Sequence, residues 1–314
     1  MFKNSERGLN LDIELKENFD IKNLTTFKVG GIVKKVYFPK SQGEFLHLMR
    51  TEKNPIILGA CSNIIFSSQG CDNTIICTSK MSNLQIRGTK IITECGVKGA
   101  YLAQKALEAG LSGFEFMIGF PGTMGGNIFM NAGAHNQSIA DTLSMVCVYD
   151  KDKDDVIYLS KQEMQFGYRH SIIQDKKYIV LGAEFDLKKE NPEKIRDLMD
   201  RNLEFRKNIQ PSLIHPNAGS IFKNPEHDSA GRLLDKAGVK GLETPNALVW
   251  NKHANFIVNK GNASSQDILE LMLMMYNKVK RTYTIELIPE VRYIGKMNKR
   301  EEEICKELYK KIQK

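Results

Sequence analysis

The sequence predicts an α+β protein with more than one domain, and two features lead to that prediction. Apolar runs typical of strands follow one another with helical segments between only some of them, which favours α+β over a doubly wound sheet. A length of 314 residues is enough for two or three separate cores. Neither a G-x-x-x-x-G-K-[ST] loop nor a G-x-G-x-x-G turn between a strand and a helix occurs, so a nucleotide would be bound by another architecture.

The first part of the chain is interpreted as an arm followed by a series of short strands. Residues 1–22 are polar and are interpreted as a short helix or an arm. Ser41 and Glu44 have the spacing of a capping box and predict the start of a helix. Residues 99–110 predict a second helix, which Gly110 would end. Strands are predicted around these helices at 32–38, 55–58, 64–66, 74–78, 84–87 and 90–95.

A turn of small residues, Gly59-Ala60-Cys61-Ser62-Asn63, joins two of these strands. Its backbone N–H groups could bind a phosphate, because small side chains let a ligand approach the main chain closely. An ordinary hairpin turn explains the same residues equally well.

The central stretch 117–135 is the least typical part of the chain. It is rich in glycine and nearly free of charge, which makes it too apolar for a solvated linker and too glycine-rich for a stable helix. Thr123, Asn127 and Asn131 add neutral hydrogen-bonding groups. The stretch therefore favours a wall for a large ligand that carries phosphates, with a tight buried crossover as the alternative.

Beyond this stretch the pattern continues with strands at 143–149, 156–159 and 178–187. Asn191 and Pro192 predict the start of a charged helix that runs to about Asn208, and Pro211 marks the best domain boundary. A polar loop at 217–225 and a short helix at 230–238 follow. Ser264 and Asp267 predict the cap of a strong amphipathic helix. A strand at 285–294 and a charged helical tail are predicted to close the chain.

Composition narrows the class of protein. With 41% hydrophobic and 26% charged residues the chain is typical of a soluble globular protein, and a net charge of +8 suits acidic ligands. No zinc-finger spacing, RNP-like motif or basic helix indicates a nucleic-acid partner. The six cysteines form no C-x-x-C pair and are predicted to be buried free thiols in a reducing compartment. No signal-peptide core and no apolar run near ~20 residues occur, so we expect a cytoplasmic protein without a membrane span.

Seven motifs in order, covering nearly the whole chain from residue 23 to 295, resemble the UDP-N-acetylenolpyruvoylglucosamine reductase family of flavoenzymes. Each motif alone is weak, but the ordered set is highly specific. They are Asn-Leu-Thr-Thr-Phe-Lys-Val-Gly-Gly (23–31), Leu-Gly-Ala-Cys-Ser-Asn (58–63), Gly-Phe-Pro-Gly-Thr-Met-Gly-Gly-Asn-Ile-Phe-Met-Asn-Ala-Gly-Ala (119–134), Phe-Gly-Tyr-Arg-His-Ser (166–171), Ala-Gly-Ser-Ile-Phe-Lys-Asn-Pro (218–225), His-Ala-Asn-Phe-Ile-Val-Asn (253–259) and Ile-Pro-Glu-Val-Arg-Tyr-Ile-Gly (288–295).

The resemblance implies a two-part FAD-binding module of the vanillyl-alcohol-oxidase (PCMH) type plus a C-terminal α+β substrate-binding domain. The short link between Pro225 and the following helix is similar to the shorter, type II form of the family. The expected division is an N-terminal arm (1–22), the FAD module (23–190, with subdomains of about 23–80 and 81–190), a connecting helix (191–211), the substrate domain (212–296) and a charged tail (297–314).

The resemblance also implies which residues bind FAD, which we expect to be non-covalent. Two segments would hold it, the turn at 59–63 and the glycine-rich stretch. The expected cofactor-binding residues are Gly59, Ala60, Cys61, Ser62, Asn63, Gly119, Pro121, Gly122, Thr123, Gly125, Gly126, Asn127, Asn131, Gly133 and Ala134.

Three residues match the catalytic positions of the family: Arg169, Ser220 and Glu290. Arg169 and Glu290 match the pair that polarises the substrate's carboxylate, and Ser220 matches the proton donor. Read singly, they would be a surface arginine, a turn serine and a solvent-facing glutamate. Their joint occurrence in three matching motifs favours the catalytic interpretation. The expected substrate contacts are Tyr168, Lys223, Asn224 and His253, and no metal is expected.

The chain departs from the family at two places. The flavin turn is usually Gly-Gly-Gly-Ser-Asn, whereas here Ala60 and Cys61 replace two glycines. The family's Gly-Gly-Ala, and the Ser before His-Ala-Asn, are replaced by Pro245-Asn246-Ala247 and Trp250-Asn251.

The expected reaction is the NADPH-dependent reduction of UDP-GlcNAc-enolpyruvate to UDP-N-acetylmuramate in peptidoglycan precursor synthesis, by a chain that acts as a monomer. Another FAD-dependent oxidoreductase on the same module, or a non-catalytic basic binding protein that kept the fold, are the alternatives. The three motifs of the C-terminal domain argue against the first, and intact Arg169, Ser220 and Glu290 argue against the second.

Overall fold

The computed structural model describes residues 12–212 and 214–310. Their contacts group them into two compact units, each with its own buried apolar cluster. The first unit holds residues 12–17, 35–60 and 73–204, and the second holds 18–34, 61–72 and 205–310. The units therefore do not follow the order of the chain, whereas the domain limits expected from sequence do. Those limits remain a prediction.

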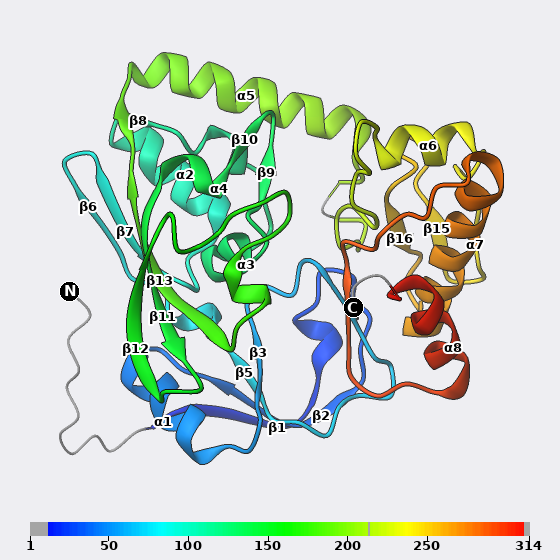
Figure 1. Ribbon diagram of the computed structural model, residues 1–314, viewed down its shortest axis with the longest axis horizontal. Helices are drawn as coiled ribbons and strands as arrows, with labels where there is room; N and C mark the ends of the chain where they lie inside the picture. The colour runs from blue at the N-terminus through cyan, green and yellow to red at the C-terminus, as the bar shows by residue number, and fades with distance from the viewer. Residues whose placement is uncertain (1–11, 213, 311–314) are drawn as a thin grey trace. The chain divides into compact units, whose positions relative to one another are not determined.

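A small sheet with the order β1-β2-β5-β3 begins the fold (Figure 1). Its strands are β1 (Glu14–Asp20), β2 (Ile32–Phe38), β5 (Ile75–Cys77) and β3 (Ile56–Leu58), and β5 pairs in parallel with both β2 and β3. Helix α1 (Gln42–Thr51) begins where Ser41 Oγ accepts the Glu44 N–H at 3.2 Å. The predicted cap is thus confirmed, with the Glu44 carboxylate accepting the Lys40 N–H.

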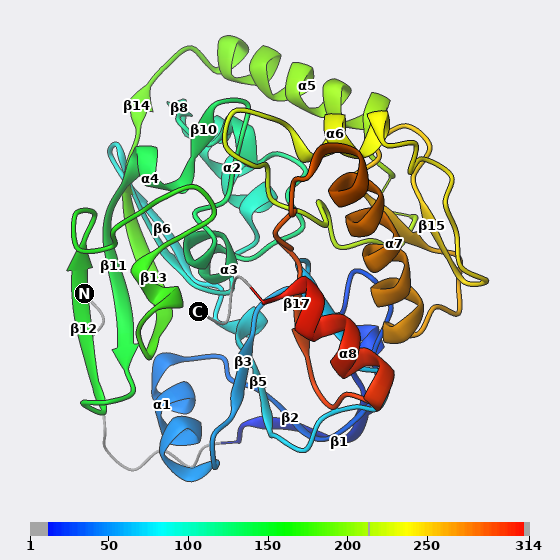
Figure 2. The same ribbon diagram turned by 45° about the vertical axis from the view of Figure 1, so that its right-hand side comes forward.

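The larger part of the first unit is a five-stranded antiparallel sheet with the order β12-β11-β13-β7-β6. Helix α2 (Gly99–Glu108) buries its apolar face in the same core, and the short helix α3 (Met124–Phe129) contacts β13 and β7 (Figure 2). The sheet strands are β6 (Leu84–Arg87), β7 (Lys90–Glu94), β11 (Leu143–Asp150), β12 (Asp155–Ser160) and β13 (Tyr178–Asp186).

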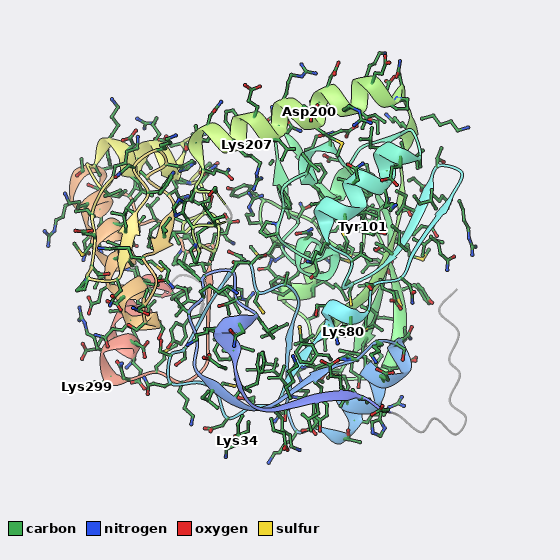
Figure 3. All side chains as sticks on the ribbon, turned by 180° about the vertical axis from the view of Figure 1, so that it is seen from behind. Lys34, Lys80, Tyr101, Asp200, Lys207 and Lys299 are labelled. Atoms are coloured by element: carbon green, nitrogen blue, oxygen red, sulfur yellow. The ribbon has the colours of Figure 1, made fainter. Side chains whose placement is uncertain are left out.

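Short elements complete this part of the chain. The pair β9 (Gly133–Ala134) and β10 (Gln137–Ser138) forms a small hairpin before α4 (Ile139–Thr142), and β8 (Leu111–Ser112) pairs with β14 (Lys188–Lys189). The long helix α5 (Pro192–Ile209) carries Asp200 and Lys207, both labelled in Figure 3. Asn191 Oδ1 accepts the Glu193 N–H at 2.8 Å, which confirms the predicted helix start.

The described part of the second unit packs the helices α6, α7 and α8 and several short strands around a separate apolar cluster. Helix α7 (Ser265–Tyr283) begins with the predicted capping box of Ser264 and Asp267, and α8 (Lys299–Leu308) packs against it. The remaining elements are α6 (Ala230–Lys236), the antiparallel pair β15 (Ala247–Val249) and β16 (Ile257–Asn259), and the parallel pair β4 (Ile64–Phe66) and β17 (Arg292–Ile294).

Three expectations from sequence are wrong. Residues 14–20 of the N-terminal segment form the edge strand β1, and only its end, at Ile21–Asn23, is a short 3-10 helix; residues 1–11 lie outside the described residues. The strand expected over 285–294 is limited to β17, because the residues before it form only an isolated antiparallel bridge, between Pro289 and Phe222. The glycine-rich stretch does contain a helix, α3, which is only six residues long and is held by bonds from outside it.

The hairpin alternative for the turn at 59–63 is also excluded. The strand before the turn, β3, pairs with β5, and the strand after it, β4, pairs with β17. The two strands thus lie in different sheets. All six cysteines are free and buried, which confirms the prediction made for the thiols.

Candidate active site

The glycine-rich stretch is anchored by the backbone of the segment that follows β7. The Met124 N–H donates to the Val97 carbonyl and the Gly125 N–H to the Cys95 carbonyl, both at 2.8 Å. A Cβ on Gly125 would lie 3.0 Å from the Cys95 Cβ, so glycine allows this close approach. These two amide groups hold α3 in place.

Thr123, just before α3, presents a buried hydroxyl without a protein partner. The residue is only 1% exposed, and its Oγ1 has no hydrogen-bond partner among the described residues. A Cβ on Gly59 would lie 2.3 Å from that oxygen, so glycine is needed at this point of the turn. Buried hydroxyl groups are nearly always bonded, and an exception calls for a ligand or a water.

The contact between Gly59 and Thr123 tests whether the two segments expected to bind FAD fit that cofactor. Gly59 belongs to the turn at 59–63 and Thr123 to the glycine-rich stretch, and the structure brings the two segments into contact. Because glycine has no Cβ, a nucleotide can approach the Gly59 backbone closely, and the neighbouring Thr123 hydroxyl can then form a hydrogen bond with one of its oxygen or nitrogen atoms. The residues present therefore fit the cofactor.

The rest of the turn leads into the second unit. Cys61 has a left-handed backbone, with a φ of +52°, although it carries a side chain, and that side chain is 5% exposed. Its carbonyl accepts the Thr26 N–H at 3.3 Å. Asn63 contacts the segment around Glu290 twice: its Nδ2 donates to the Glu290 carbonyl at 3.2 Å, and its own carbonyl accepts the Arg292 N–H at 3.1 Å.

Arg169 lies in a strained loop of the first unit. Its φ is +54°, its Nη2 donates to the Gly133 carbonyl at 3.1 Å, and its guanidinium stands 5.1 Å from the centre of the Tyr168 ring. Gln174 Nε2 donates to the Arg169 carbonyl at 3.1 Å. Asn131 Nδ2 donates to the Gly167 carbonyl at 2.9 Å. The loop is thus bound to the glycine-rich stretch.

Two further residues expected to bind the cofactor, Asn131 and Asn127, also have partners within the protein. Asn131 uses its Nδ2 on Gly167, and its Oδ1 accepts the Ala140 N–H at 3.1 Å. Asn127 is 6% exposed, and its Nδ2 lies 3.9 Å from the Met124 Sδ. Of these two, Asn131 therefore positions the loop that carries Arg169.

Ser220 and Glu290 are brought together in the second unit. The Glu290 N–H donates to the carbonyl of Ile221, the residue after Ser220, at 2.8 Å. Asn255 holds the same strand-like segment: its Oδ1 accepts the Phe222 N–H at 2.9 Å, and its Nδ2 donates to the Phe222 carbonyl at 2.8 Å.

The turn before Ser220 is also defined. Asn217 Oδ1 accepts the Gly219 N–H at 3.0 Å, and Gly219 has a φ of +75°, which glycine adopts without strain. The proton-donor candidate therefore follows a turn that needs its glycine.

The expected substrate contacts lie in both units. Tyr168 is 54% exposed in the first unit. In the second unit the Lys223 N–H donates to the Ile288 carbonyl at 2.8 Å, and Asn224 Oδ1 accepts the Ala230 N–H at 3.0 Å. His253 Nδ1 accepts the Asn255 N–H at 3.2 Å, and burial lowers the pKa of its imidazole below the ordinary value.

Sequence reasoning missed several residues that shape the site. Asn255, Gln174 and Arg292 lie inside or next to the quoted motifs but received no role. Burial lowers the pKa of the Arg292 guanidinium and of the Arg206 guanidinium. Guanidinium groups are suited to anionic ligands, and the Pro-Glu-Val-Arg motif was the signal that could have identified Arg292.

Two negative findings apply to the described residues. They contain no cluster of three or more His, Cys, Asp or Glu side chains arranged to hold a metal ion. Within the same residues, no helix combines the length and apolar character needed to cross a bilayer.

Known proteins match both parts of the chain. The family described as UDP-N-acetylenolpyruvoylglucosamine reductase, C-terminal domain, matches residues 210–294, and the family described as FAD binding domain matches residues 33–153. The UDP-N-acetylenolpyruvoylglucosamine reductase of Caldicellulosiruptor bescii is 39% identical over 293 residues, 91% of this chain and 92% of the relative. That of Caldanaerobacter subterraneus subsp. tengcongensis is 41% identical over 282 residues, 88% of this chain and 93% of the relative.

A solved structure agrees with the sequence relatives. The crystal structure of the UDP-N-acetylenolpyruvylglucosamine reductase of Thermus caldophilus covers 90% of this chain and 98% of its own, with a TM-score of 0.77 and 32% identity. An FAD-binding domain joined to a reductase domain defines the chain as a flavin-dependent oxidoreductase of α+β fold. The chain belongs to the UDP-N-acetylenolpyruvoylglucosamine reductase family. The resemblance recognised from the seven motifs is confirmed.

Proposed function

We propose that this chain reduces the enolpyruvyl group of UDP-N-acetylglucosamine-enolpyruvate to give UDP-N-acetylmuramate, with NADPH as the hydride donor and FAD as a non-covalent cofactor. Membership of the reductase family over about nine tenths of the chain carries this proposal. The product is a peptidoglycan precursor, so the chain serves cell-wall synthesis, cell shape and division. We further propose that it works as a monomer in the cytoplasm.

FAD would be held by the turn at 59–63 and by the stretch at 119–134, where the Thr123 hydroxyl lies beside Gly59. When bound, FAD takes a hydride from NADPH and supplies it to the β-carbon of the enolpyruvyl group. The addition leaves negative charge on the α-carbon, delocalised into the carboxylate. The protein must stabilise that charge and then protonate the α-carbon.

Arg169 and Glu290 are assigned to the carboxylate. A guanidinium forms charge-assisted hydrogen bonds with a carboxylate, and these bonds strengthen as charge develops in the transition state. The contact of Arg169 with the Gly133 carbonyl and that of Gln174 with the Arg169 carbonyl fix the loop before substrate arrives. Such preorganisation avoids reorganisation during the reaction.

Ser220 is assigned to deliver the proton. Its hydroxyl would stand over the α-carbon, and the bond between the Glu290 N–H and the Ile221 carbonyl fixes its distance from the glutamate along the backbone. A serine is a weak acid, so its neighbour Lys223 is expected to assist the transfer by stabilising the alkoxide that remains.

The test separates the two half-reactions by stopped-flow absorbance of the flavin. In Ser220→Ala, reduction of FAD by NADPH should stay near the wild-type rate, because the hydroxyl acts only afterwards. Oxidation of reduced FAD by the enolpyruvyl substrate should slow by about 10²–10⁴-fold. Ser212→Ala, an exposed serine of the same unit, is the matched control and should change neither rate.

Two results would contradict these assignments. If Ser220→Ala slowed flavin reduction and left the substrate reaction intact, the role of Ser220 would be wrong. If reduced wild-type enzyme were not oxidised by the enolpyruvyl substrate at all, the chain would be another flavin-dependent oxidoreductase.

A further inference from the structure

The main chain of the segment that carries Glu290 is held by hydrogen bonds from backbone and side-chain groups. The Glu290 N–H donates to the Ile221 carbonyl at 2.8 Å, and the Glu290 carbonyl accepts Asn63 Nδ2 at 3.2 Å. The next peptide unit, between Val291 and Arg292, is bound at both ends. Its N–H donates to the Asn63 carbonyl at 3.1 Å, and its carbonyl accepts the Tyr309 hydroxyl at 2.9 Å.

Tyr309 comes from a part of the chain that no functional assignment covers. It follows the last residue of α8, and the match to the reductase C-terminal domain ends at residue 294. Burial raises the pKa of its phenol, so the hydroxyl stays protonated and keeps donating throughout the working pH range. Its ring packs at the edge of the apolar cluster of the second unit.

Helix α8 is itself fixed, so the hydroxyl has a defined position. At the start of the helix, Glu301 is 1% exposed and accepts Ser265 Oγ at 2.5 Å and Gln69 Nε2 at 3.0 Å. Arg300 forms a two-pronged ion pair with Glu270 of α7, with distances of 2.7 and 2.9 Å. At the other end, Ile304, Cys305 and Leu308 are buried. The helix therefore connects α7 rigidly to the Val291 carbonyl.

We propose that Tyr309 is a positioning residue for the reductase reaction, and that α8 acts through it to hold the Glu290–Arg292 segment in the geometry that the substrate requires. This inference rests on the proposed function of Glu290. Tyr309 itself touches neither substrate nor cofactor in this account. It acts by fixing one peptide unit, and a small displacement of a positioned carboxyl group is costly in rate.

The variant Tyr309→Phe keeps the ring and removes only the hydroxyl. In the holoenzyme, oxidation of reduced FAD by the enolpyruvyl substrate should slow on the order of tenfold, which corresponds to one lost hydrogen bond. Reduction of FAD by NADPH should not change. Tyr149→Phe is the matched control, because the Tyr149 hydroxyl donates to Asp154 Oδ1 at 2.8 Å in the first unit and holds no part of the Glu290 segment. It should leave both rates unchanged.

A double-mutant cycle distinguishes positioning from general destabilisation. If Tyr309 acts through Glu290, Tyr309→Phe should cost little or nothing in a Glu290→Gln background. An equal slowing in both backgrounds, an equal slowing by Tyr149→Phe, or no slowing by Tyr309→Phe would each overturn the inference. A wild-type enzyme that fails to oxidise its flavin with the substrate would instead overturn the proposed function, and this inference with it.

Hydrogen exchange provides a second measurement that does not depend on turnover. In Tyr309→Phe holoenzyme, the peptide over 288–295 should exchange faster, since one end of the Val291–Arg292 peptide unit is released. Peptides from the sheet of the first unit should be unchanged. Unaltered exchange over 288–295 would show that the hydroxyl does not hold this segment and would also overturn the inference.

Discussion

Removing the Thr123 hydroxyl is predicted to stabilise the apoprotein and to weaken its binding of FAD. Thr123→Val keeps the shape of the side chain and replaces the unpartnered Oγ1 by a methyl group. An unsatisfied buried hydroxyl costs about 1–3 kcal/mol, so the apoprotein should gain on the order of 1 kcal/mol in free energy of unfolding. If the hydroxyl bonds FAD, the complex loses that bond. The FAD dissociation constant should then rise about tenfold or more.

The measurements are denaturant unfolding of deflavinated protein and a fluorescence titration with FAD. An unchanged dissociation constant would show that Oγ1 does not contact the cofactor. A less stable apoprotein would show that the hydroxyl is satisfied in solution, for instance by water. Either result would refute the reasoning from the buried hydroxyl.

A substitution at Gly59 tests the same contact through a second quantity, the free energy of unfolding. In Gly59→Ala the new Cβ would overlap Thr123 Oγ1 at 2.3 Å, and overpacking of this kind costs about 1–3 kcal/mol. Gly59→Ala combined with Thr123→Ala should recover most of that loss, because the next contact of the Cβ is 3.7 Å away, with Thr123 Cβ. Gly126→Ala is the matched control, since its Cβ would lie 3.9 Å from the same oxygen and apoprotein stability should not fall.

Three further predictions follow from the site. Denaturation should release free FAD, because the cofactor is expected to be non-covalent; flavin retained on the precipitated chain would contradict this. Alkylation of Cys61, mapped by mass spectrometry, should be slow in holoenzyme and faster after FAD removal, whereas Cys95, whose pKa burial raises to about 12, should react slowly in both states. Equal Cys61 rates would place the turn away from the cofactor. Because burial lowers the pKa of His253 below 6.5, its contribution to stability is present above about pH 6.5 and lost as the pH falls through the lower folded value. The free energy of unfolding, measured with denaturant, should therefore fall less between about pH 8 and about pH 5 in His253→Gln than in the wild type. An equal fall in both proteins would refute that assignment.

The elements that sequence predicted correctly are those whose signals are local. Ser264 and Asp267 define the start of α7 within four residues, and Asn191 with Pro192 does the same for α5. The partners of these caps are next to them in the chain, so no knowledge of the fold is needed. Gly110, with a φ of +64°, follows the end of α2 for the same kind of reason.

The elements that failed depend on distant residues. The segment before β17 is bound to Ile221 and Lys223, which lie far from it in sequence, through an isolated bridge between Pro289 and Phe222. Helix α3 forms in spite of its glycines because the carbonyls of Cys95 and Val97 accept its first amide groups. Propensity alone cannot include bonds of this kind, since tertiary contacts outweigh about 1 kcal/mol per glycine.

In the candidate site, too, the sequence shows the chemical groups but not the contacts between distant residues. The motifs named Arg169, Ser220 and Glu290 because side-chain chemistry is visible in a sequence. The supporting groups are not visible there. Asn131 and Asn63 are both predicted to bind FAD, and the structure adds contacts that the motifs do not show: the Asn131 amide holds the Arg169 loop, and Asn63 contacts the Glu290 segment twice. An amide side chain can bind a ligand or a backbone, and only the fold decides between them.

Two of the predicted site residues have a strained backbone conformation. Cys61 and Arg169 both have left-handed φ values, +52° and +54°, which cost an L-residue roughly 1–2 kcal/mol. Such strain persists only where surrounding bonds impose it. At Arg169 those bonds are the Gln174 contact with its carbonyl and the Asn131 contact with Gly167. At Cys61 the carbonyl is held by the Thr26 N–H. The family usually has glycine at the Cys61 position, where the same turn carries no such cost. This chain therefore carries a conformational cost at Cys61, and at Arg169 the bond from Nη2 to the Gly133 carbonyl sets the direction of the guanidinium on which the proposed chemistry depends.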